Sequence, residues 1–559
     1  MKTSIVPSRS YIQLILPLKL GWEPYYSVEE GTELEVGDRV KAEFAHREYI
    51  GVVSCTGANP KAQGVSPESV KSIIGKEDAF PKISAREIAF WKQISSYYLC
   101  TVGEVYKAAY PAERTAVKAP RKKSPEAGTA PSPVALSPIL DNALEDIHSA
   151  FKAGRTVLLE GPAGSGKTQL YLKLAEETLS QGRSVLLLVP EIALSRQLEE
   201  RVRKVFPQLR TYHSALTPAS RRLVGKEVRE GIATIVLGTR SSLFLPYKDL
   251  GLVIVDEEHD TSYKQTSPAP RYNTRETAIM LSSVHGANVI LGSATPSLES
   301  LYNADKGIFT SVKLKHNFTE RKDPGLFFVN TSAEQRKNGM SGSFSLKLLT
   351  EMKEALDAGD SILLVCRAKA AATELSEEVS RIFPDSENSI TITTPSGIKL
   401  LPGGSFALTA ILQADSLLGK DDFRADEHTL QLLQQLLDRS VRSMVIQTRE
   451  SNHPVFKALK SNGNAMALLP ERRAFGYPPV TRLVRIEIKD YNEKRLQKLS
   501  VLLSRELSTI KAATMGNFCF LLPRDKTLHA KKQSIYKIVE DFERKYHYSS
   551  HIVIDVDPV

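Results

Sequence analysis

The stretch GPAGSGKT, residues 161–168, is the part of the sequence whose residue types and spacing point most directly to chemistry. Its glycines let consecutive backbone N–H groups converge on phosphate oxygens, Lys167 reaches the outer phosphates of a nucleotide, and the hydroxyl of Thr168 is a magnesium ligand. The alternative is a glycine-rich turn that contains a lysine by chance and binds no nucleotide. The residues predicted to bind the nucleotide are Gly161, Pro162, Ala163, Gly164, Ser165, Gly166, Lys167 and Thr168.

A second motif, LVIVDEEHD, supplies the acids that a phosphate-binding loop needs for hydrolysis. We expect Asp256 to hold magnesium through water and Glu257 to orient and deprotonate the attacking water. Solvated acids at a strand end are the alternative. His259 stays open between a residue that senses the γ-phosphate or couples to DNA and a histidine that packs locally.

The elements that must position these residues alternate between strand and helix from Arg155 onward. The runs TVLLE, SVLLLV, TIVLG, LGLVIVD and NVILG lack polar alternation, which predicts a parallel sheet covered by helices on both faces. In such a sheet the carboxyl ends of the strands face one crevice, so the loop and the acids should meet there. Residues 344–450 contain a weaker second set of strands, and the expected fold class is α/β.

Charge and cysteine usage restrict the class of protein. Lysine and arginine total 74 against 64 aspartates and glutamates, and the resulting charge of +10 favours polyanionic partners such as nucleic acid. The four cysteines, Cys55, Cys100, Cys366 and Cys519, lie far apart without a C-x-x-C pair, which indicates neither a disulfide framework nor a zinc module and fits the reducing cytoplasm. No apolar run approaches the roughly 20 residues of a membrane span, so no membrane partner is expected.

The two ends of the chain have different patterns from the centre. Residues 1–110 contain short strands and turns, followed by a helical pattern from Ser84. Residues 112–137, rich in Ala, Pro and Lys, are expected to form a linker. After His453, two strand patterns flank an amphipathic helix and predict a small α+β domain.

At DEEHDTSYKQ the sequence resembles the DEEH-type superfamily 2 helicases, and among them the PriA family of replication-restart helicases. LLLVPEIALSRQL, YHSALTPASRR, GTRSSLFLPYKDL, PRYNTRETA and LGSATPSLES follow in that family's order. LPLKLGWEPYYSVEEGTELEVGDRVKAEF is similar to its N-terminal DNA-binding domain, SYYLCTVGEVYKAAYP to the start of a winged helix, and ERRAFGYPPVTRLVRI to its C-terminal domain.

The resemblance implies a RecA-like helicase lobe 1 and a shortened lobe 2 with flanking DNA-binding parts. The expected domains are an N-terminal β DNA-binding domain (1–78), a winged-helix-like segment (79–111), a linker (112–137), the ATP-binding lobe 1 (138–312), the shortened lobe 2 (313–452) and a C-terminal α+β domain (453–559).

A loop after the acidic motif interleaves aromatics with cations, which suits stacking on unpaired bases. The predicted DNA contacts are Arg240, on a phosphate, together with Tyr263, Lys264, Arg271, Tyr272 and Arg275. A purely structural loop remains the alternative.

Four departures from the family bear on lobe 2 and on nucleotide choice. The cysteine-rich zinc insertion is missing and Cys366 stands alone, so no zinc is expected. The segment G-T-Q-M-x-x-K-G is replaced by TTPSGIKLLPGGSFAL around residues 393–408. The adenine-reading glutamine is absent, with Leu140 and Asp141 in its region, so the choice between ATP and GTP stays open.

The fourth departure is in the arginine motif Q-x-x-G-R-x-x-R, which becomes QLLDRSVR. Gln435, Arg439 and Arg442 are present, but Asp438 and Val441 replace glycines. Arg439 and Arg442 are the candidates that would stabilise charge on the transferred phosphoryl group. Arginines in the last turn of a helix are also a common capping arrangement that needs no ATP.

The resemblance implies an ATP-dependent 3′-5′ DNA helicase, or DNA-dependent ATPase, of replication restart. ATP and Mg²⁺ would be its cofactors, and single-stranded or forked DNA and other replication-restart proteins its partners. The alternative is a fork-binding scaffold that binds ATP without unwinding, because strand separation requires two lobes that close on nucleotide. A generic P-loop ATPase acting on protein is a third, weaker interpretation.

Overall fold

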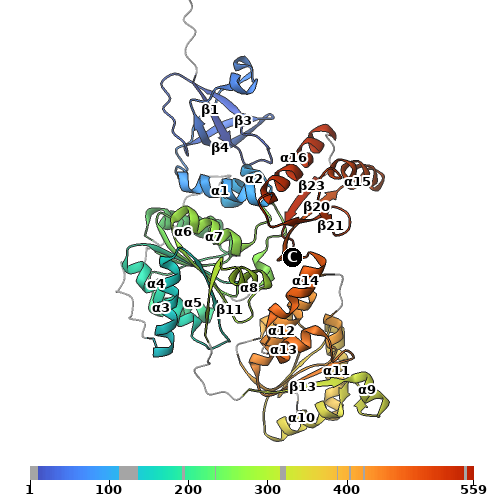
Figure 1. The fold of residues 1–559 in the computed structure, drawn as a ribbon. Coiled ribbons are helices and arrows are strands. Elements are labelled where there is room, and N and C mark those ends of the chain that lie inside the picture. The colour runs from blue at the N-terminus through green and yellow to red at the C-terminus, as the bar shows by residue number, and fades with distance from the viewer. Residues whose placement is uncertain are drawn as a thin grey trace, which may run out of the picture.

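The computed structural model describes residues 10–559 apart from 112–135, 192–195, 233, 315–322, 385, 387, 402–403, 419–421, 462 and 547–550. The expected linker falls almost wholly outside the described residues. Four units are visible: an N-terminal β domain, two α/β lobes and a C-terminal domain that lies beside the N-terminal one (Figure 1). None of the described helices has the length and apolar character needed to cross a membrane.

The N-terminal domain is an antiparallel sheet with the strand order β2-β1-β4-β3-β5. Its strands are β1 (Ser10–Ile15), β2 (Tyr25–Val28), β3 (Arg39–Phe44), β4 (Arg47–Thr56) and β5 (Gly75–Lys76). Apolar residues alternate along these strands, so that Ile12, Leu14, Val40 and Val53 share one core.

Two helices, α1 (Ala85–Tyr98) and α2 (Val102–Ala109), follow this sheet, and each begins with a capping box. The ring of Trp91 stacks on that of Tyr106, with 5.5 Å between centroids. Residues 79–111, all of them described, contain no strand. The winged-helix-like segment expected here is therefore a helix pair, which lies between the N-terminal sheet and a helix of lobe 1 and also contacts the last strand of the C-terminal domain.

Lobe 1 is a parallel sheet of seven strands in the order β12-β6-β11-β10-β7-β9-β8. The strands are β6 (Thr156–Glu160), β7 (Ser184–Leu188), β8 (Arg210–Tyr212), β9 (Ile235–Gly238), β10 (Leu250–Val255), β11 (Asn288–Ser293) and β12 (Phe309–Lys313). The helices are α3 (Pro138–Lys152), α4 (Lys167–Ser180), α5 (Arg196–Val205), α6 (Pro218–Glu230), α7 (Thr274–His285) and α8 (Leu298–Asp305). Alternate residues of β6 enter two separate cores, Leu158 on one face and Val157 and Leu159 on the other. Both faces are covered, as the unbroken apolar runs predicted.

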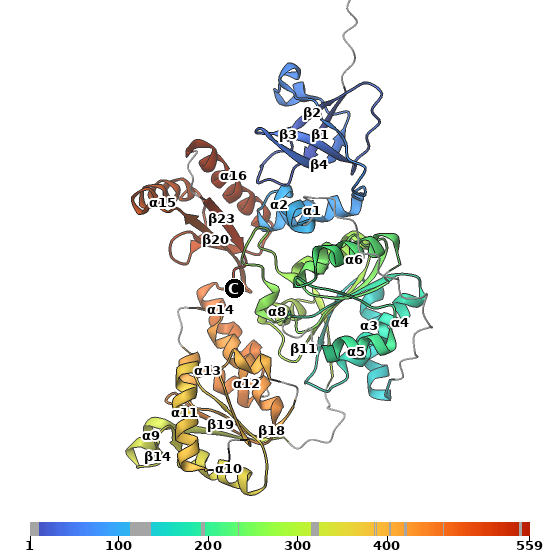
Figure 2. The same ribbon diagram turned by 180° about the vertical axis from the view of Figure 1, so that it is seen from behind.

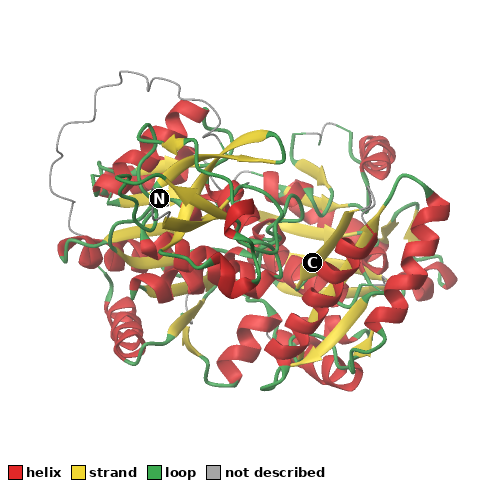
Figure 3. Ribbon diagram, turned by 90° about the horizontal axis from the view of Figure 1, so that it is seen from above, coloured by secondary structure: helices red, strands yellow, loops and turns green. Residues whose placement is uncertain are grey.

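Lobe 2 is a second parallel sheet, in the order β13-β19-β18-β16-β17. Its strands are β13 (Gly325–Asn330), β16 (Ile362–Val365), β17 (Ile390–Thr393), β18 (Phe406–Ile411) and β19 (Ser440–Thr448), with a small hairpin of β14 (Met340–Ser341) and β15 (Phe344–Ser345). Its helices are α9 (Thr331–Arg336), α10 (Leu346–Asp357), α11 (Lys369–Ile382), α12 (Ala425–Arg439), α13 (Pro454–Lys460) and α14 (Leu469–Phe475). Seen from above, helices flank the strands of both lobes (Figure 3).

The core of lobe 2 continues beyond the boundary expected at residue 452. Phe456 on α13 and Leu469 on α14 share a buried cluster with Leu433 and Leu436 of α12. The lobe therefore extends to the end of α14, because these helices cover a face of its sheet that would otherwise expose apolar side chains.

The C-terminal domain is an antiparallel sheet in the order β21-β22-β20-β23. It consists of β20 (Thr481–Lys489), α15 (Glu493–Leu507), β21 (Ala513–Thr514), β22 (Cys519–Pro523), α16 (Leu528–Tyr546) and β23 (His551–Val556). The two helices cover one face of the sheet, where Val484 and Ile486 pack with Leu503 and Val539. The other face is turned toward lobe 1 and lobe 2 (Figure 2).

Candidate nucleotide site between the lobes

The loop GPAGSGKT joins the end of β6 to the start of α4. Gly164 and Gly166 have φ values of 79° and 93°, a left-handed conformation that costs glycine little. A Cβ atom on Gly161 would lie 2.6 Å from Oγ of Ser165 and 2.9 Å from Cβ of Leu314. The three glycines are therefore required by the backbone path that the loop takes.

Two polar side chains of this loop point into its interior. The ammonium of Lys167 is buried and donates to the carbonyl oxygens of Gly161 and Pro162, at 3.2 Å from the latter. The hydroxyl of Ser165 is buried and has no hydrogen-bond partner in the part of the chain that the structure describes. A buried ammonium and an uncommitted hydroxyl in a loop of this shape fit a phosphate group.

Asp256 and Glu257 follow β10 and lie at the same end of the sheet as the loop. The hydroxyl of Tyr171 on α4 donates to Oδ1 of Asp256 at 3.0 Å. Burial and the charge of Glu257 raise the pKa of Asp256 to about 6, although Lys167 lowers it. Since an added Cβ on Gly292 would meet the Tyr171 hydroxyl at 1.6 Å, this glycine makes the Tyr171–Asp256 contact possible.

Glu257 has a φ of 50°, a conformation that non-glycine residues seldom adopt. Enclosure by the protein raises the pKa of its carboxyl, Lys167 opposes the rise, and the carboxylates of Asp260, Glu258 and Asp438 add to it. The side chain is about a third exposed. A carboxylate of raised pKa that water can reach is suited to act as a general base.

His259 lies between lobe 1 and lobe 2. Its Nδ1 is 2.7 Å from Oγ of Ser293, its Nε2 is 3.2 Å from Oγ1 of Thr295, and the same Nε2 is 3.1 Å from Nε2 of Gln435 on α12. A ring protonated on Nδ1 would donate to Ser293 and accept from the Gln435 amide. The imidazole ring of His259 therefore contacts residues of both lobes.

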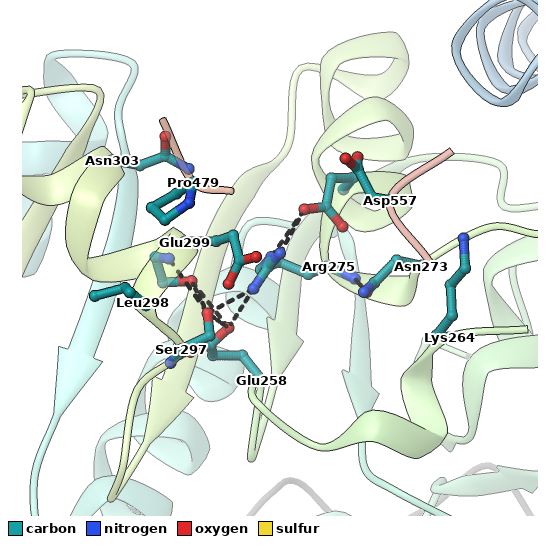
Figure 4. Close-up of polar contacts among 12 residues, drawn as sticks. Glu258, Lys264, Asn273, Arg275, Ser297, Leu298, Glu299, Asn303, Pro479 and Asp557 are labelled. Carbon is teal, nitrogen blue, oxygen red and sulfur yellow. Dashed lines mark hydrogen bonds and ion pairs between the residues drawn. The ribbon is translucent and has the colours of Figure 1, made fainter. Parts of the chain in front are cut away.

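A buried ionic cluster surrounds the next acid of the motif, Glu258. Arg275 lies 3.1 Å from Oε2 of Glu258 and donates to the hydroxyl of Ser297 at 2.6 Å, while the Ser297 amide donates to Oε1 of Glu258 at 2.7 Å (Figure 4). The three residues connect the acidic motif to the start of α8.

The cluster continues into lobe 2 through charged residues of α12 and α14. The amide of Leu298 donates to Glu427 at 2.8 Å, Arg472 lies 3.2 Å from Glu427, and Arg424 lies 3.0 Å from Glu299. Burial opposes ionisation of Glu299, yet Arg424 and Arg275 bring its pKa down to about 2. The lobes are thus joined by buried, paired charges, whose disruption is costly.

The loop predicted to stack on DNA bases is instead buried against the C-terminal domain. Tyr263 donates its hydroxyl to the carbonyl oxygen of Asp256 at 2.7 Å. The ammonium of Lys264, fully buried, lies 2.8 Å from Asp555 and donates to the carbonyl oxygen of Val556. Arg271 lies 3.2 Å from both Asp555 and Glu487.

The remaining predicted DNA contacts also bind groups of the protein: Tyr272 and Arg275 are buried, and Arg240 is half-buried. Arg240 donates to the carbonyl oxygens of Ser262 and Lys264, and the hydroxyl of Tyr272 donates to the carbonyl oxygen of Arg240. Arg275 belongs to the ionic cluster of Glu258. The prediction of base stacking for Tyr263, Lys264, Arg271, Tyr272 and Arg275 is corrected: alternating aromatics and cations also form buried contacts between domains, and that is their arrangement here. The phosphate contact predicted for Arg240 stays a prediction.

The two candidate arginines of lobe 2 have different surroundings. Arg442 donates to the carbonyl oxygen of Glu351 at 2.8 Å and pairs with the carboxylates of Glu351 and Glu354 at 3.7 and 3.8 Å. Its position on β19 turns it toward α10, so the catalytic role predicted for it is corrected. Arg439 ends α12 one turn after Gln435, on the helix face that meets lobe 1, and its Nη1 is buried without a hydrogen-bond partner among the described residues.

Asp438 lies on the wall of a cavity of about 730 Å³ between the lobes. Gly161 and Pro162 of the phosphate-binding loop, Ala294 and Lys460 of α13 line the same cavity. A cavity of this volume is large enough for a small-molecule ligand. The aspartate that replaces a glycine in the arginine motif therefore faces the loop.

Several residues of the site were not predicted from the sequence. Tyr171 stands four positions after Lys167 on α4, so helical spacing could have placed it beside the loop. No pattern in the nearby sequence marked Glu299, Glu427 and Arg424, because their partners are far away in the sequence.

Cys366 donates its thiol to the carbonyl oxygen of Thr393. The described residues hold no group of three or more His, Cys, Asp or Glu placed for a metal.

Two family matches agree with this arrangement. Residues 138–304, lobe 1 and the site acids, match the DEAD/DEAH box helicase family. Residues 13–111 match the 3′ DNA-binding domain (3′BD) family of PriA. The second match runs through α1 and α2, so that these helices belong with the N-terminal sheet.

The fold and the site combine a phosphate-binding lobe 1 that matches the DEAD/DEAH box helicase family with an N-terminal part that matches a DNA-binding domain family. The chain is similar in sequence to replication restart proteins named PriA from several bacteria. It is 37% identical to the protein of Bacillus subtilis over 231 residues, which are 41% of this chain and 28% of that one. It is 30% identical to the Chlamydia pneumoniae protein over 64% of this chain and 61% of that one, and 27% identical to the Helicobacter pylori (strain 26695) protein over 91% and 92%.

The alignments with the Chlamydia pneumoniae and Rickettsia conorii relatives span 61% and 54% of those proteins. A structure of RecG bound to a three-way DNA junction aligns with 84% of this chain and 75% of its own at a TM-score of 0.39 and 15% identity, a likeness too distant to carry any conclusion.

Proposed function

We propose that this protein is a PriA-type, DNA-dependent ATPase that unwinds forked DNA with 3′ to 5′ polarity during replication restart. The observation that carries the proposal is the contact of His259 with Gln435, which joins the acidic motif of lobe 1 to the arginine-bearing helix of lobe 2. A contact of this kind lets the state of the nucleotide site bias the position of the lobes.

ATP would be held by the backbone of the loop 161–168 and by Lys167, and Thr168 with Asp256 would hold Mg²⁺. The uncommitted hydroxyl of Ser165 and the buried carboxyl of Asp256 fit these roles. When bound, Mg²⁺ would neutralise charge on the phosphates. Tyr171 fixes the carboxyl of Asp256 through its hydroxyl, and Lys167 exchanges the carbonyl oxygens that it now contacts for phosphate oxygens.

Glu257 orients a water molecule and accepts its proton. Its raised pKa makes the carboxylate a stronger base than a solvent-exposed glutamate. Arg439 approaches from lobe 2 to stabilise negative charge on the transferred group, an effect that commonly contributes several powers of ten to the rate. Arg442 has no part in this step, because Glu351 and Glu354 hold it within lobe 2.

DNA binding is assigned to the N-terminal domain and helices α1 and α2, residues 13–111, and strand translocation to the two lobes. The C-terminal domain, fastened to lobe 1 by Lys264 and Arg271, would move with that lobe. Other replication-restart proteins are the proposed protein partners.

The test is strand displacement from a forked duplex, measured together with ATP hydrolysis in the presence and absence of DNA. We expect DNA to stimulate hydrolysis, and the fork to be unwound from a 3′ single strand. Lys167→Ala should abolish both activities. Tight fork binding without DNA-stimulated turnover would contradict the motor and favour the fork-binding scaffold.

A further inference from the structure

Three aromatic rings, those of Phe475, Tyr477 and Phe423, form a ladder where α14 leads into the C-terminal domain. The rings of Phe475 and Tyr477 stack with centroids 5.6 Å apart and an interplanar angle of 20°, and Tyr477 lies 5.3 Å from Phe423. Phe475, at the outer end, is 61% exposed, one of the largest exposures of an aromatic side chain among the described residues. One face of its ring is therefore available for a further planar group.

The inner end of the ladder is fixed by two buried arginines. The guanidinium groups of Arg424 and Arg472 lie 4.5 and 4.8 Å from the centroid of Phe423. Both arginines are held in turn by Glu299 and Glu427 in the ionic cluster between the lobes. The ladder is thus rigid, and binding a planar group on Phe475 would cost little ordering entropy.

A positively charged strand, β20, adjoins the ladder on the face of the C-terminal sheet that α15 and α16 leave uncovered. Leu483, Cys519 and Leu521 of that face pack with Tyr477 and Phe423. Because residues two apart on a strand share a face, Arg485, Glu487 and Lys489 continue the face away from the ladder.

Cations are in excess along this strand. Four cations, Lys264 and Arg271 from lobe 1 and Arg485 and Lys489 from β20, share the two carboxylates of Glu487 and Asp555. The side chains of Arg485 and Lys489 are 41% and 63% exposed, and both can reach an anion in solvent. Arg473, on the turn of α14 before Phe475, is exposed as well, and the neighbouring Glu471 offsets its charge.

We propose that the ladder and this strand bind an unpaired DNA strand, with a base stacked on the outer face of Phe475 and phosphates on Arg485 and Lys489. Proteins that bind single-stranded DNA without sequence preference combine aromatic rings, on which bases stack, with positively charged side chains that contact the phosphates. This inference rests on the proposed function, because it takes DNA as the ligand. It adds a DNA-binding surface on lobe 2 and the C-terminal domain.

The test compares two oligonucleotides of equal length and charge, one of thymidines and one of abasic units, by fluorescence anisotropy without nucleotide. Phe475→Ala should weaken binding of the thymidine strand about tenfold, the scale of one lost base stack, and leave binding of the abasic strand unchanged. Tyr491→Ala removes a fully exposed aromatic from the loop after β20 and serves as the matched control, with no effect on either strand. Lys489→Gln should weaken both strands and reduce the salt slope by about one.

Phe475→Ala would overturn the stacking site if it weakened binding of both strands equally or of neither. The absence of any loss is also the result expected if this surface binds a protein instead of DNA. The readout is independent of hydrolysis. The two proposals can therefore fail separately. If DNA does not stimulate ATP hydrolysis by the wild-type protein, but Phe475→Ala still weakens binding of the thymidine strand alone, the proposed function fails and the binding site stands.

Discussion

Nε2 of His259 lies 3.1 Å from the side-chain nitrogen of Gln435, so the acidic motif of lobe 1 and the arginine-bearing helix of lobe 2 meet through two side chains. The other ring nitrogen of His259 contacts Ser293 at the end of β11. A change at the nucleotide site can therefore reach α12 by way of one imidazole ring.

Gln435→Ala should reduce DNA-stimulated ATP hydrolysis about tenfold while changing basal hydrolysis much less, since couplings between sites are commonly worth 0.5–2 kcal/mol. The measurement is the hydrolysis rate with and without saturating single-stranded DNA. Gln434→Ala is the matched control, because the neighbouring amide of Gln434 donates to Gly463 within lobe 2. Equal losses in the two variants would show that the His259 contact carries no coupling.

Asp438 places a carboxylate on the cavity wall opposite the phosphate-binding loop, and its charge adds to the raised pKa of Glu257. Asp438→Asn should lower the KM for ATP about three- to tenfold, because one negative charge no longer opposes the phosphates. Steady-state kinetics measure this, and Asp357→Asn, an exposed acid of lobe 2, is the control. An unchanged or higher KM would mean that Asp438 does not face the bound nucleotide.

Lys264 forms a buried ion pair between lobe 1 and the C-terminal domain. Its replacement should therefore lower the stability of the protein more than its affinity for DNA. Lys264→Met leaves Asp555 with Arg271 and Arg485, and we expect the free energy of unfolding to fall by about 3 kcal/mol. Denaturant unfolding gives this value, with the exposed Lys337→Met for comparison. Unchanged stability with a large loss of DNA affinity would restore Lys264 as a direct DNA contact.

Lys532 on α16 is a buried lysine that donates to the carbonyl oxygen of Tyr97 and lies 4.1 Å from the ring centroid of that residue. Burial lowers its pKa from 10.5 to about 8, against the opposing effect of Asp557. The folded protein thus bears the full cost of the buried charge below pH 8, about 2–4 kcal/mol, and this cost declines as the pH rises toward the value of the unfolded chain.

Lys532→Met should therefore be more stable than the wild type at pH 7, and the difference should shrink between pH 8 and 9.5. Thermal unfolding across that range measures it. A difference that stays constant or grows with pH would contradict a depressed pKa for this lysine.

The sequence was most informative where the signals are local. The apolar runs predicted the strands of lobe 1, and the spacing of Gly161, Lys167 and Asp256 predicted a nucleotide site that the fold brings together. Tyr263 and Lys264 show the limit: composition suggested an exposed binding loop, but their partners Asp256 and Asp555 are set by tertiary structure. Arg442 shows the same limit. Its spacing in the sequence fits a catalytic motif, but in the structure it pairs with Glu351 instead.

Strand displacement by wild-type protein and by Glu257→Gln tests the central claim most directly. With a forked duplex carrying a 3′ single strand, the wild type should unwind the fork in the presence of ATP and Mg²⁺. Glu257→Gln should still bind ATP and the fork but release no strand, because the side chain that accepts the proton of the attacking water is gone. Unwinding by Glu257→Gln at the wild-type rate, or no unwinding by the wild type despite fork binding, would contradict a motor driven by hydrolysis at this site.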